Sequence, residues 1–330
     1  MELIRAMIRR SRRRSRALAI ELSRQSAPAL AALLAPEEGS DCGAGWRELG
    51  NKLAAFDGFV DAARLLPPAA SGSPRPPITA ALLWALAGDP YAALWRVEGL
   101  GYALAGPAWA GEGGAPGAPP RGLLQTEALP ERALIPLHLG MGMAFAERLL
   151  ADLAAGLAAE PAVERLLRRF LDLSLDNARP GCVDALCEPL GFVARLLHPH
   201  LLPLLDRGLA GISPALRAFL WHGAGRGLYF LPSHALPWCN PWRRALGKAL
   251  AEPPHALGRR NMLGGLAFAV ALINLRQPRI VEGFLQAGDR CAACEAGAAH
   301  AVLVWDRVRP DGLAAGEGWP DLFRLGGGEP

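Results

Sequence analysis

The sequence has few of the residues that build β-sheets. Aromatic residues make up 7% of its 330 positions, with three tyrosines, and β-branched residues are sparse. Sheets are enriched in exactly these two classes of residue, whereas alanine and leucine lose little side-chain freedom in a helix. Alanine and leucine supply most of the 51% hydrophobic content, and many of the 38 glycines and 29 prolines fall at expected helix ends. We therefore predict an all-α fold.

The chain lacks an uncharged apolar run of the roughly 18–20 residues that a membrane-spanning helix needs. The longest such run, 261–275, has 15 residues between Arg260 and Arg276, so we predict a buried core helix there. No apolar stretch with a cleavage site follows the N-terminal arginines, which argues against a secretory signal. Six cysteines without regular spacing fit reduced thiols and a cytoplasmic location.

A basic nucleic-acid-binding face is also missing, although the formal net charge is +4. Residues 1–24 hold eight arginines against two glutamates, and the remaining 306 residues carry 27 basic and 29 acidic groups. The positive charge therefore belongs to an expected N-terminal helix at residues 2–25, and we predict no nucleic-acid partner. That helix either contacts a membrane surface or an acidic partner, or it is a solvated arm.

Common catalytic and cofactor motifs are absent. The chain has no nucleophile elbow, no zinc-protease helix and no phosphate loop, and no strand precedes Gly223–Gly227. Cys291 and Cys294 have metal-like spacing, but zinc takes four ligands and no second clear pair follows. The missing ligands would have to come from Cys182 and Cys187 or from His198 and His200, and neither pair is close to Cys291 and Cys294 in the sequence. We predict buried thiols, no metal and no cofactor.

What the chain does have is a repeat. Leu139–Ala146 returns as Leu263–Ala269 at an offset of 123, and Trp95–Gly101 returns as Trp221–Gly227 at an offset of 126. Two landmarks in the same order predict a tandem-duplicated helical unit. The repeated glycine helix is expected at 136–159 and again at 261–275.

Prolines and helix-capping residues indicate where these units begin. Pro67–Pro77 is a proline-rich linker, and Asp89-Pro90 and Ser213-Pro214 each combine a capping residue with a proline at the first helical position. The predicted division has three parts: the N-terminal section 1–77, the first repeat unit 78–212, and the second unit with the tail, 213–330.

The glycines of the repeated helices need an explanation, because each costs about 1 kcal/mol relative to alanine inside a helix. The usual compensation is close approach of another backbone or of a ligand. One hypothesis is therefore tight helix packing. The other is a flat apolar ligand on the glycine face, surrounded by Met141, Met143, Phe145 and Phe268.

Four polar residues lie on these apolar helices. Glu98 and His138 can act as an acid–base pair or simply hydrogen-bond two helices together. His222 and Arg226 lie four positions apart, so Arg226 can hold an anion or pair with a carboxylate of a facing helix. In the second unit Ala224 aligns with Glu98. The candidate ligand-binding residues are Glu98, His138, Met143, Phe145, His222, Arg226 and Phe268.

Four stretches resemble an uncharacterised bacterial family encoded beside enediyne-type iterative polyketide synthases. They are Val97–Ala103, His138–Ala146, Gly223–Phe230 and Arg259–Ala267, in the order the family has them. Asp176–Gly181 departs from the family, which tends to show an Asp-Gly-Tyr-Gly-Phe-His-like segment there.

The resemblance implies an accessory role in polyketide or specialised-metabolite biosynthesis and transfers no catalytic residue. The leading hypothesis is a non-catalytic protein that binds an apolar intermediate or a synthase or carrier partner. The first alternative is an enzyme acting on a polyketide-derived intermediate, with Glu98, His138, His222 and Arg226 in one pocket. The second is a peripheral membrane scaffold held by residues 2–25.

Overall fold

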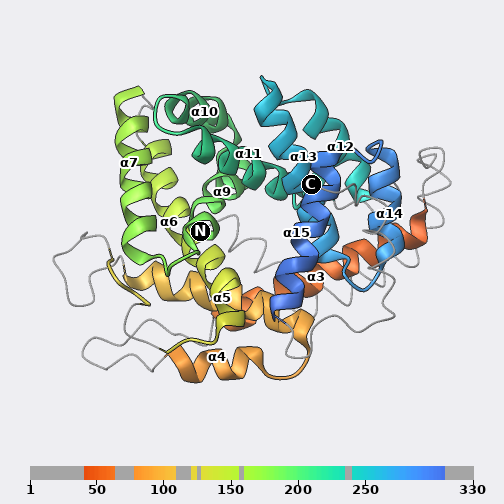
Figure 1. Ribbon diagram of the computed structural model, residues 1–330, viewed down its shortest axis with the longest axis horizontal. Coiled ribbons are helices and arrows are strands. Elements are labelled where there is room, and N and C mark those ends of the chain that lie inside the picture. The colour runs from red at the N-terminus through yellow and green to blue at the C-terminus, as the bar shows by residue number, and fades with distance from the viewer. Residues whose placement is uncertain are drawn as a thin grey trace, which may run out of the picture.

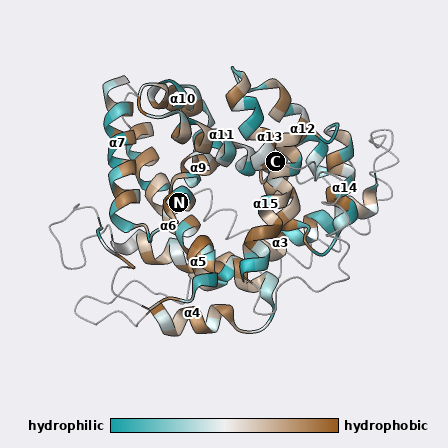
Figure 2. Ribbon diagram, viewed as in Figure 1, coloured by the Kyte–Doolittle hydropathy of each residue, from teal (hydrophilic) through white to brown (hydrophobic). Residues whose placement is uncertain are grey.

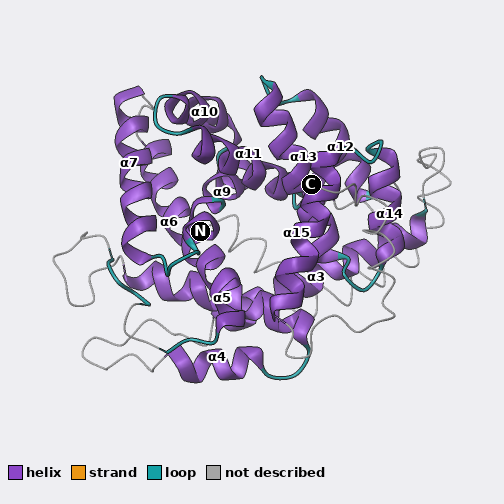
Figure 3. Cartoon of the chain, in the orientation of Figure 1, coloured by secondary structure: helices purple, strands orange, loops and turns teal. Residues whose placement is uncertain are grey.

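The computed structural model describes residues 41–63, 78–108, 120–124, 128–155, 160–234 and 240–308, and this part of the chain is helical without any strand (Figure 3). The all-α prediction is confirmed. The basic segment 2–25 lies outside these residues. The helices are α3 (Cys42–Ala63), α4 (Ile78–Leu86), α5 (Pro90–Ala108), α6 (Glu131–Ala155), α7 (Glu160–Asn177), α8 (Val183–Cys187), α9 (Pro189–Leu197), α10 (Leu202–Ala210), α11 (Pro214–Tyr229), α12 (Pro241–Ala251), α13 (Ala256–Ile273), α14 (Pro278–Ala287) and α15 (Ala292–Val308), with short 3₁₀ turns at Pro199–Leu201 and Pro232–His234.

Six helices form a closed series of contacts at the centre of the fold. In order, α5 packs on α6, α6 on α9, α9 on α11, α11 on α13, and α13 on α15, while α15 also touches α5 and α6. Helix α3 lies against α5 and reaches α13. Figure 1 shows α4, α7, α10, α12 and α14 around the outside. The helices of the central series are therefore the ones that can bring distant side chains together.

The outer helices α7, α10, α12 and α14 combine an apolar face with a polar one, whereas α4 and the central helices are apolar on most sides (Figure 2). In α7 the buried residues Val163, Leu167 and Phe170 alternate with exposed arginines and glutamate. In α13 every residue from Met262 to Ile273 is buried. Helices that are apolar all round belong in the interior, which explains the division into two layers.

The core helix expected at 261–275 is α13, which begins earlier, at Ala256. The other repeated helix does not begin at Pro136: α6 starts at Glu131 and keeps that proline inside. Pro136 is the sixth residue of α6, so the helix lacks the hydrogen bond that a backbone N–H at this position would donate to the carbonyl four residues earlier. The sequence does not predict helices α8 to α10, between 183 and 210. Prolines interrupt this region, and each helix is too short to show a clear helical repeat of apolar residues.

The two expected helix starts differ in their caps. The amide of Tyr91 donates to Asp89 Oδ1 at 3.2 Å, so Asp89 caps α5 as predicted. Ser213 precedes Pro214 at the start of α11, but its side chain makes no capping hydrogen bond. The cap predicted for Ser213 is therefore wrong, and only the proline of that pair favours the helix start.

Two helices are long and apolar enough to span a membrane by length and composition. They are Glu131–Ala154 and Ala256–Ile273, and most of their apolar windows, 83% and 72% respectively, is buried inside the fold. Core helices pass the same test, so this is weak evidence for a membrane location.

Candidate functional site

The glycine faces are filled by neighbouring backbones. A Cβ on Gly101 would overlap the Leu137 carbonyl, and one on Gly140 would overlap the Glu98 carbonyl, where α5 crosses α6. Gly225 and Gly265 stand in the same relation to Met262 and His222 where α11 crosses α13. Tight helix packing therefore accounts for the glycines, and the hypothesis of an apolar ligand lying on them is wrong.

These crossings bring Glu98 and Arg226 together at the centre of the molecule. Arg226 on α11 is 3% exposed, and its guanidinium donates to Glu98 of α5 through Nη2 and to Glu188 through Nη1 at 3.1 Å. The same guanidinium carbon lies 4.6 Å from the centre of the Phe192 ring. Arg226 therefore pairs with carboxylates of facing helices, which was one of its two predicted roles.

Glu188 occupies the N-cap position of α9 but makes no capping bond with its side chain. Its carboxylate turns inward, where Oε2 accepts from Arg226 and Oε1 lies 3.3 Å from Nδ1 of His222. His222 and Arg226, four positions apart on α11, thus share one carboxylate. We call Glu98, Glu188, His222 and Arg226 the charge cluster.

Burial and charge act in opposite directions on the two carboxyl groups. Burial raises the pKa of Glu98, and the attraction of Arg226 does not cancel that effect. Burial also acts to raise the pKa of Glu188, but Arg226 and His222 together outweigh it and hold that pKa below its usual value. The pKa of Arg226 is raised, since its two carboxylate partners outweigh burial. Glu188 is thus the permanent anion and Glu98 the better proton acceptor.

Three rings cover the outer end of the charge cluster. The His222 side chain is 20% exposed, and its ring centre lies 5.7 Å from that of Phe268 on α13 and 6.4 Å from that of His300 on α15. Phe268 and His300 are 5.3 Å apart, and His300 is exposed. We call these three residues the histidine edge, in which His300 is exposed, His222 is partly exposed and Phe268 is buried.

The other candidates do not join this site. His138 is fully buried, and its ring nitrogens bond to the Leu134 carbonyl at 2.6 Å and to the Arg179 amide at 3.0 Å. Burial lowers its pKa, which keeps the ring neutral in this structural role. Met143 and Phe145 are buried core residues of α6. Both ring nitrogens of His138 are therefore bonded outside the charge cluster, and the pocket expected to combine His138 with Glu98, His222 and Arg226 stays a prediction.

Sequence reasoning missed Glu188 and His300. Glu188 stands directly before Pro189, and a glycine follows at position 191. This segment is not part of the sequence repeat, so the repeat does not draw attention to it. A glutamate before proline at the start of an apolar run was the available signal. His300 has no such signal, because only the packing of α15 on α13 brings it to the site.

A second buried network ties α3 to α11 and α13. Lys52 donates to the Tyr229 carbonyl at 2.8 Å, Tyr229 donates its hydroxyl to Glu48, and Asn274 donates to that hydroxyl at 3.0 Å. Burial raises the pKa of Glu48 to about 7, against the pull of Lys52, and lowers the pKa of Lys52 to about 8. These hydrogen bonds all join protein groups to one another, which is typical of buried polar residues with a structural role.

Across the residues that the structure describes, no group of three or more histidine, cysteine, aspartate or glutamate side chains is arranged to hold a metal ion. The Asp206 carboxylate, for example, is already engaged in hydrogen bonds with protein groups. Its partners are Arg217, the Trp221 indole at 2.6 Å and His255 at 3.0 Å.

Comparison with known proteins returned no matching family model, no matching curated protein and no matching solved structure.

Proposed function

We propose that this protein is an accessory component of polyketide-type, enediyne-related specialised-metabolite biosynthesis that binds an intermediate at the histidine edge. The observation that supports the binding role is the packing of His222, Phe268 and His300 over a buried charge cluster. Imidazoles offer hydrogen bonds to hydroxyl and carbonyl oxygens, and the exposed ring of His300 can pack on a conjugated chain. The biosynthetic setting comes from the family resemblance.

The charges of the cluster indicate which intermediates fit. Arg226 is already shared between two carboxylates, so it has little attraction left for an anionic ligand. When both carboxyl groups are ionised, Glu98, Glu188 and Arg226 together carry one negative charge in excess. An added carboxylate in this half-buried place is repelled, because Coulomb interactions are stronger than in water. The preferred ligand is therefore a neutral conjugated chain that carries hydroxyl or keto groups.

Binding of a straight-chain conjugated polyene alcohol, and of the matching polyene carboxylic acid, tests this proposal. Titration followed by polyene absorbance should give tighter binding of the alcohol. Loss of one hydrogen bond and one ring contact costs about 1.4 kcal/mol, so His300→Ala should weaken binding about tenfold.

His200→Ala is the matched control, because His200 is also an exposed histidine but lies in the turn before α10. It should leave the affinity unchanged. Absence of polyene binding up to the solubility limit, or equal affinity of the two alanine variants, would contradict the proposed binding role.

The opposite pKa shifts of Glu98 and Glu188 favour a second candidate, an acid–base enzyme for such intermediates. Pairs of carboxyl groups with separated pKa values are typical of acid–base catalysis. His222 lies between Glu188 and solvent and can carry a proton between them. Incubation with a polyene thioester, followed by mass spectrometry, tests for conversion. Conversion lost in His222→Gln supports the enzyme, and an unchanged thioester with the wild-type protein speaks against it.

A further inference from the structure

Helix α15 begins with a cysteine pair that the proposed function does not use. Cys291 directly precedes the first helical residue, Ala292, and Cys294 lies in the first turn. Cys291 is partly exposed, whereas Cys294 is completely buried. The prediction that both are buried thiols therefore holds for Cys294 only.

The two sulfur atoms are already in contact. Cys291 Sγ lies 2.7 Å from Cys294 Sγ, and the backbone amide of Cys294 donates to Cys291 Sγ at 3.3 Å. A disulfide bond is about 2.05 Å long, so the two Sγ atoms are already near bonding distance. Bond formation therefore needs rotation about the side-chain bonds and no rearrangement of the helix.

The outer sulfur lies at the start of the helix, where a backbone amide points toward it. The free amides and the helix dipole stabilise negative charge there, and a thiolate is the nucleophile in thiol–disulfide exchange. The amide of Cys294 already points at Cys291 Sγ. Burial raises the pKa of the Cys294 thiol, so the inner sulfur stays protonated while the outer one reacts.

The turn before the pair is in an uncommon conformation. Asp289 and Arg290 both have positive φ, 53° and 46°, although neither is glycine. This conformation is unfavourable for residues with a side chain, and strain of this kind persists where the surrounding structure requires a fixed geometry. The turn ends in a hydrogen bond from the Cys291 amide to the Gly288 carbonyl, which fixes the first cysteine at the helix start.

A zinc site is the other use of this spacing. Zinc in proteins takes four ligands, and no third cysteine, histidine or carboxylate accompanies the pair among the described residues. The backbone packing of the helix also encloses the inner side, because a Cβ on Gly288 would lie 3.4 Å from Cys294 Sγ. The geometry is that of two sulfurs facing each other.

We propose that Cys291 and Cys294 form a redox-active dithiol that exchanges with small disulfides. The Cys291 thiolate attacks one sulfur of the disulfide RSSR, forms a mixed disulfide and releases RS⁻, which takes up a proton. Cys294 then attacks Cys291 Sγ and expels the second RS⁻, which takes up the proton that Cys294 gives up. The net reaction converts the protein dithiol and RSSR into the protein disulfide and two RSH, so the protein is oxidised and the small disulfide reduced.

Oxidised glutathione is the probe, used on the full chain in a series of glutathione buffers, with thiol alkylation and peptide mapping as the readout. The peptide that contains both residues should change from two alkylated thiols to an internal disulfide in one two-electron transition. In Cys294→Ala the exchange should stop at a glutathione adduct on Cys291. In Cys291→Ala no adduct should form on the buried Cys294.

Cys182 and Cys187 serve as internal controls, because both are buried thiols and the pKa of Cys187 is raised to about 11 by burial. They should stay reduced throughout. A wild-type peptide that remains dithiol in the most oxidising buffer, or an adduct found on Cys294 in place of Cys291, would overturn the proposal. So would alkylation that proceeds only after a zinc chelator is added. The wild-type mapping decides the question even if Cys294→Ala fails to fold.

Discussion

The crossing of α5 with α6 and the crossing of α11 with α13 share their backbone contacts but differ in their polar side chains. Gly101 and Gly225, which are 124 positions apart, each meet a carbonyl of the second helix of their crossing. Gly140 and Gly265, 125 positions apart, each meet a carbonyl of the first helix of their crossing. These positions do not follow the offsets of 126 and 123 that sequence similarity indicates. The tandem duplication itself stays a prediction.

The helix contacts pair the residues of the two crossings differently from the sequence alignment. The carbonyls that receive Gly140 and Gly265 belong to Glu98 and His222, so His222, and not Ala224, stands where Glu98 stands in the first crossing. Four positions further on, Tyr102 corresponds to Arg226. The first crossing thus presents an acid and a phenol, and the second presents an imidazole and a guanidinium. Equivalent backbone positions with complementary charge allow one cluster to form between the two crossings.

The largest expected effect comes from removing the cation that joins the crossings. Arg226→Met leaves Glu98 and Glu188 buried without their partner, and loss of one member of a buried ion pair costs about 4 kcal/mol. Urea unfolding at pH 7.5 should show this loss. At pH 5 the loss should be smaller, because the raised pKa of Glu98 allows it to bind a proton.

The double variant Arg226→Met with Glu98→Gln should recover part of the stability, since it removes one of the orphaned charges. A single variant that unfolds at the same urea concentration as the wild type would show that the cluster does not hold the two crossings together.

The second prediction asks whether the two crossings are equally tight. Gly140→Ala and Gly265→Ala each place a Cβ against a backbone carbonyl that cannot rotate away, so both should lose about 3 kcal/mol of unfolding free energy. Gly247→Ala is the matched control on α12, where nothing lies within 4 Å of an added Cβ. It should gain up to about 1 kcal/mol from helix propensity. A large loss in only one crossing would show that the two crossings are not equally tight.

The repeated glycines of the sequence predict close helix packing, but the sequence does not predict which residues meet where the helices cross. Glycine and aromatic residues repeat visibly, and together with the alanine- and leucine-rich composition they predict an all-helical core. The register depends on which carbonyl each glycine meets, and that is decided by how the helices pack in three dimensions. For the same reason Arg226 and Glu98 were identifiable as unusual polar residues, whereas His300 was not. Only α15 lying on α13 makes His300 part of the histidine edge.

The third prediction concerns the tie from α3 to the second crossing. The pKa of Glu48 is raised to about 7 in the folded chain, above its ordinary value of 4.5, so the folded state binds the extra proton between these values. Its contribution to stability is therefore full below about pH 4.5 and is lost as the pH rises toward 7. Relative to Glu48→Gln, the wild type should lose about 1.5 kcal/mol between pH 5.5 and 7.

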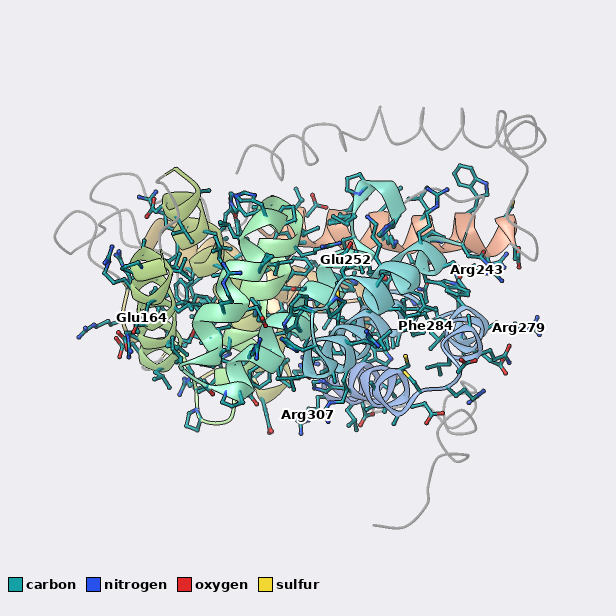
Figure 4. All side chains as sticks on the ribbon, turned by 90° about the horizontal axis from the view of Figure 1, so that it is seen from above. Glu164, Arg243, Glu252, Arg279, Phe284 and Arg307 are labelled. Carbon is teal, nitrogen blue, oxygen red and sulfur yellow. The ribbon has the colours of Figure 1, made fainter. Side chains whose placement is uncertain are left out.

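Glu164→Gln is the control, because Glu164 is exposed on α7 and lies at the outer edge of the molecule, at the opposite end from Arg279 (Figure 4). Its stability difference from the wild type should stay flat over the same pH range. A flat difference for Glu48→Gln as well would mean that Glu48 is ionised at all these pH values.

The smallest expected effect separates the starts of α5 and α11. Asp89→Ala removes the bond from the Tyr91 amide and should cost about 1 kcal/mol, of which the exposed ion pair with Arg276 supplies little. Ser213→Ala should change the unfolding free energy by less than about 0.5 kcal/mol, because this side chain caps nothing. Thermal unfolding of both variants measures the difference. Equal losses would mean that Ser213 caps α11 in solution and that the two helix starts are alike after all.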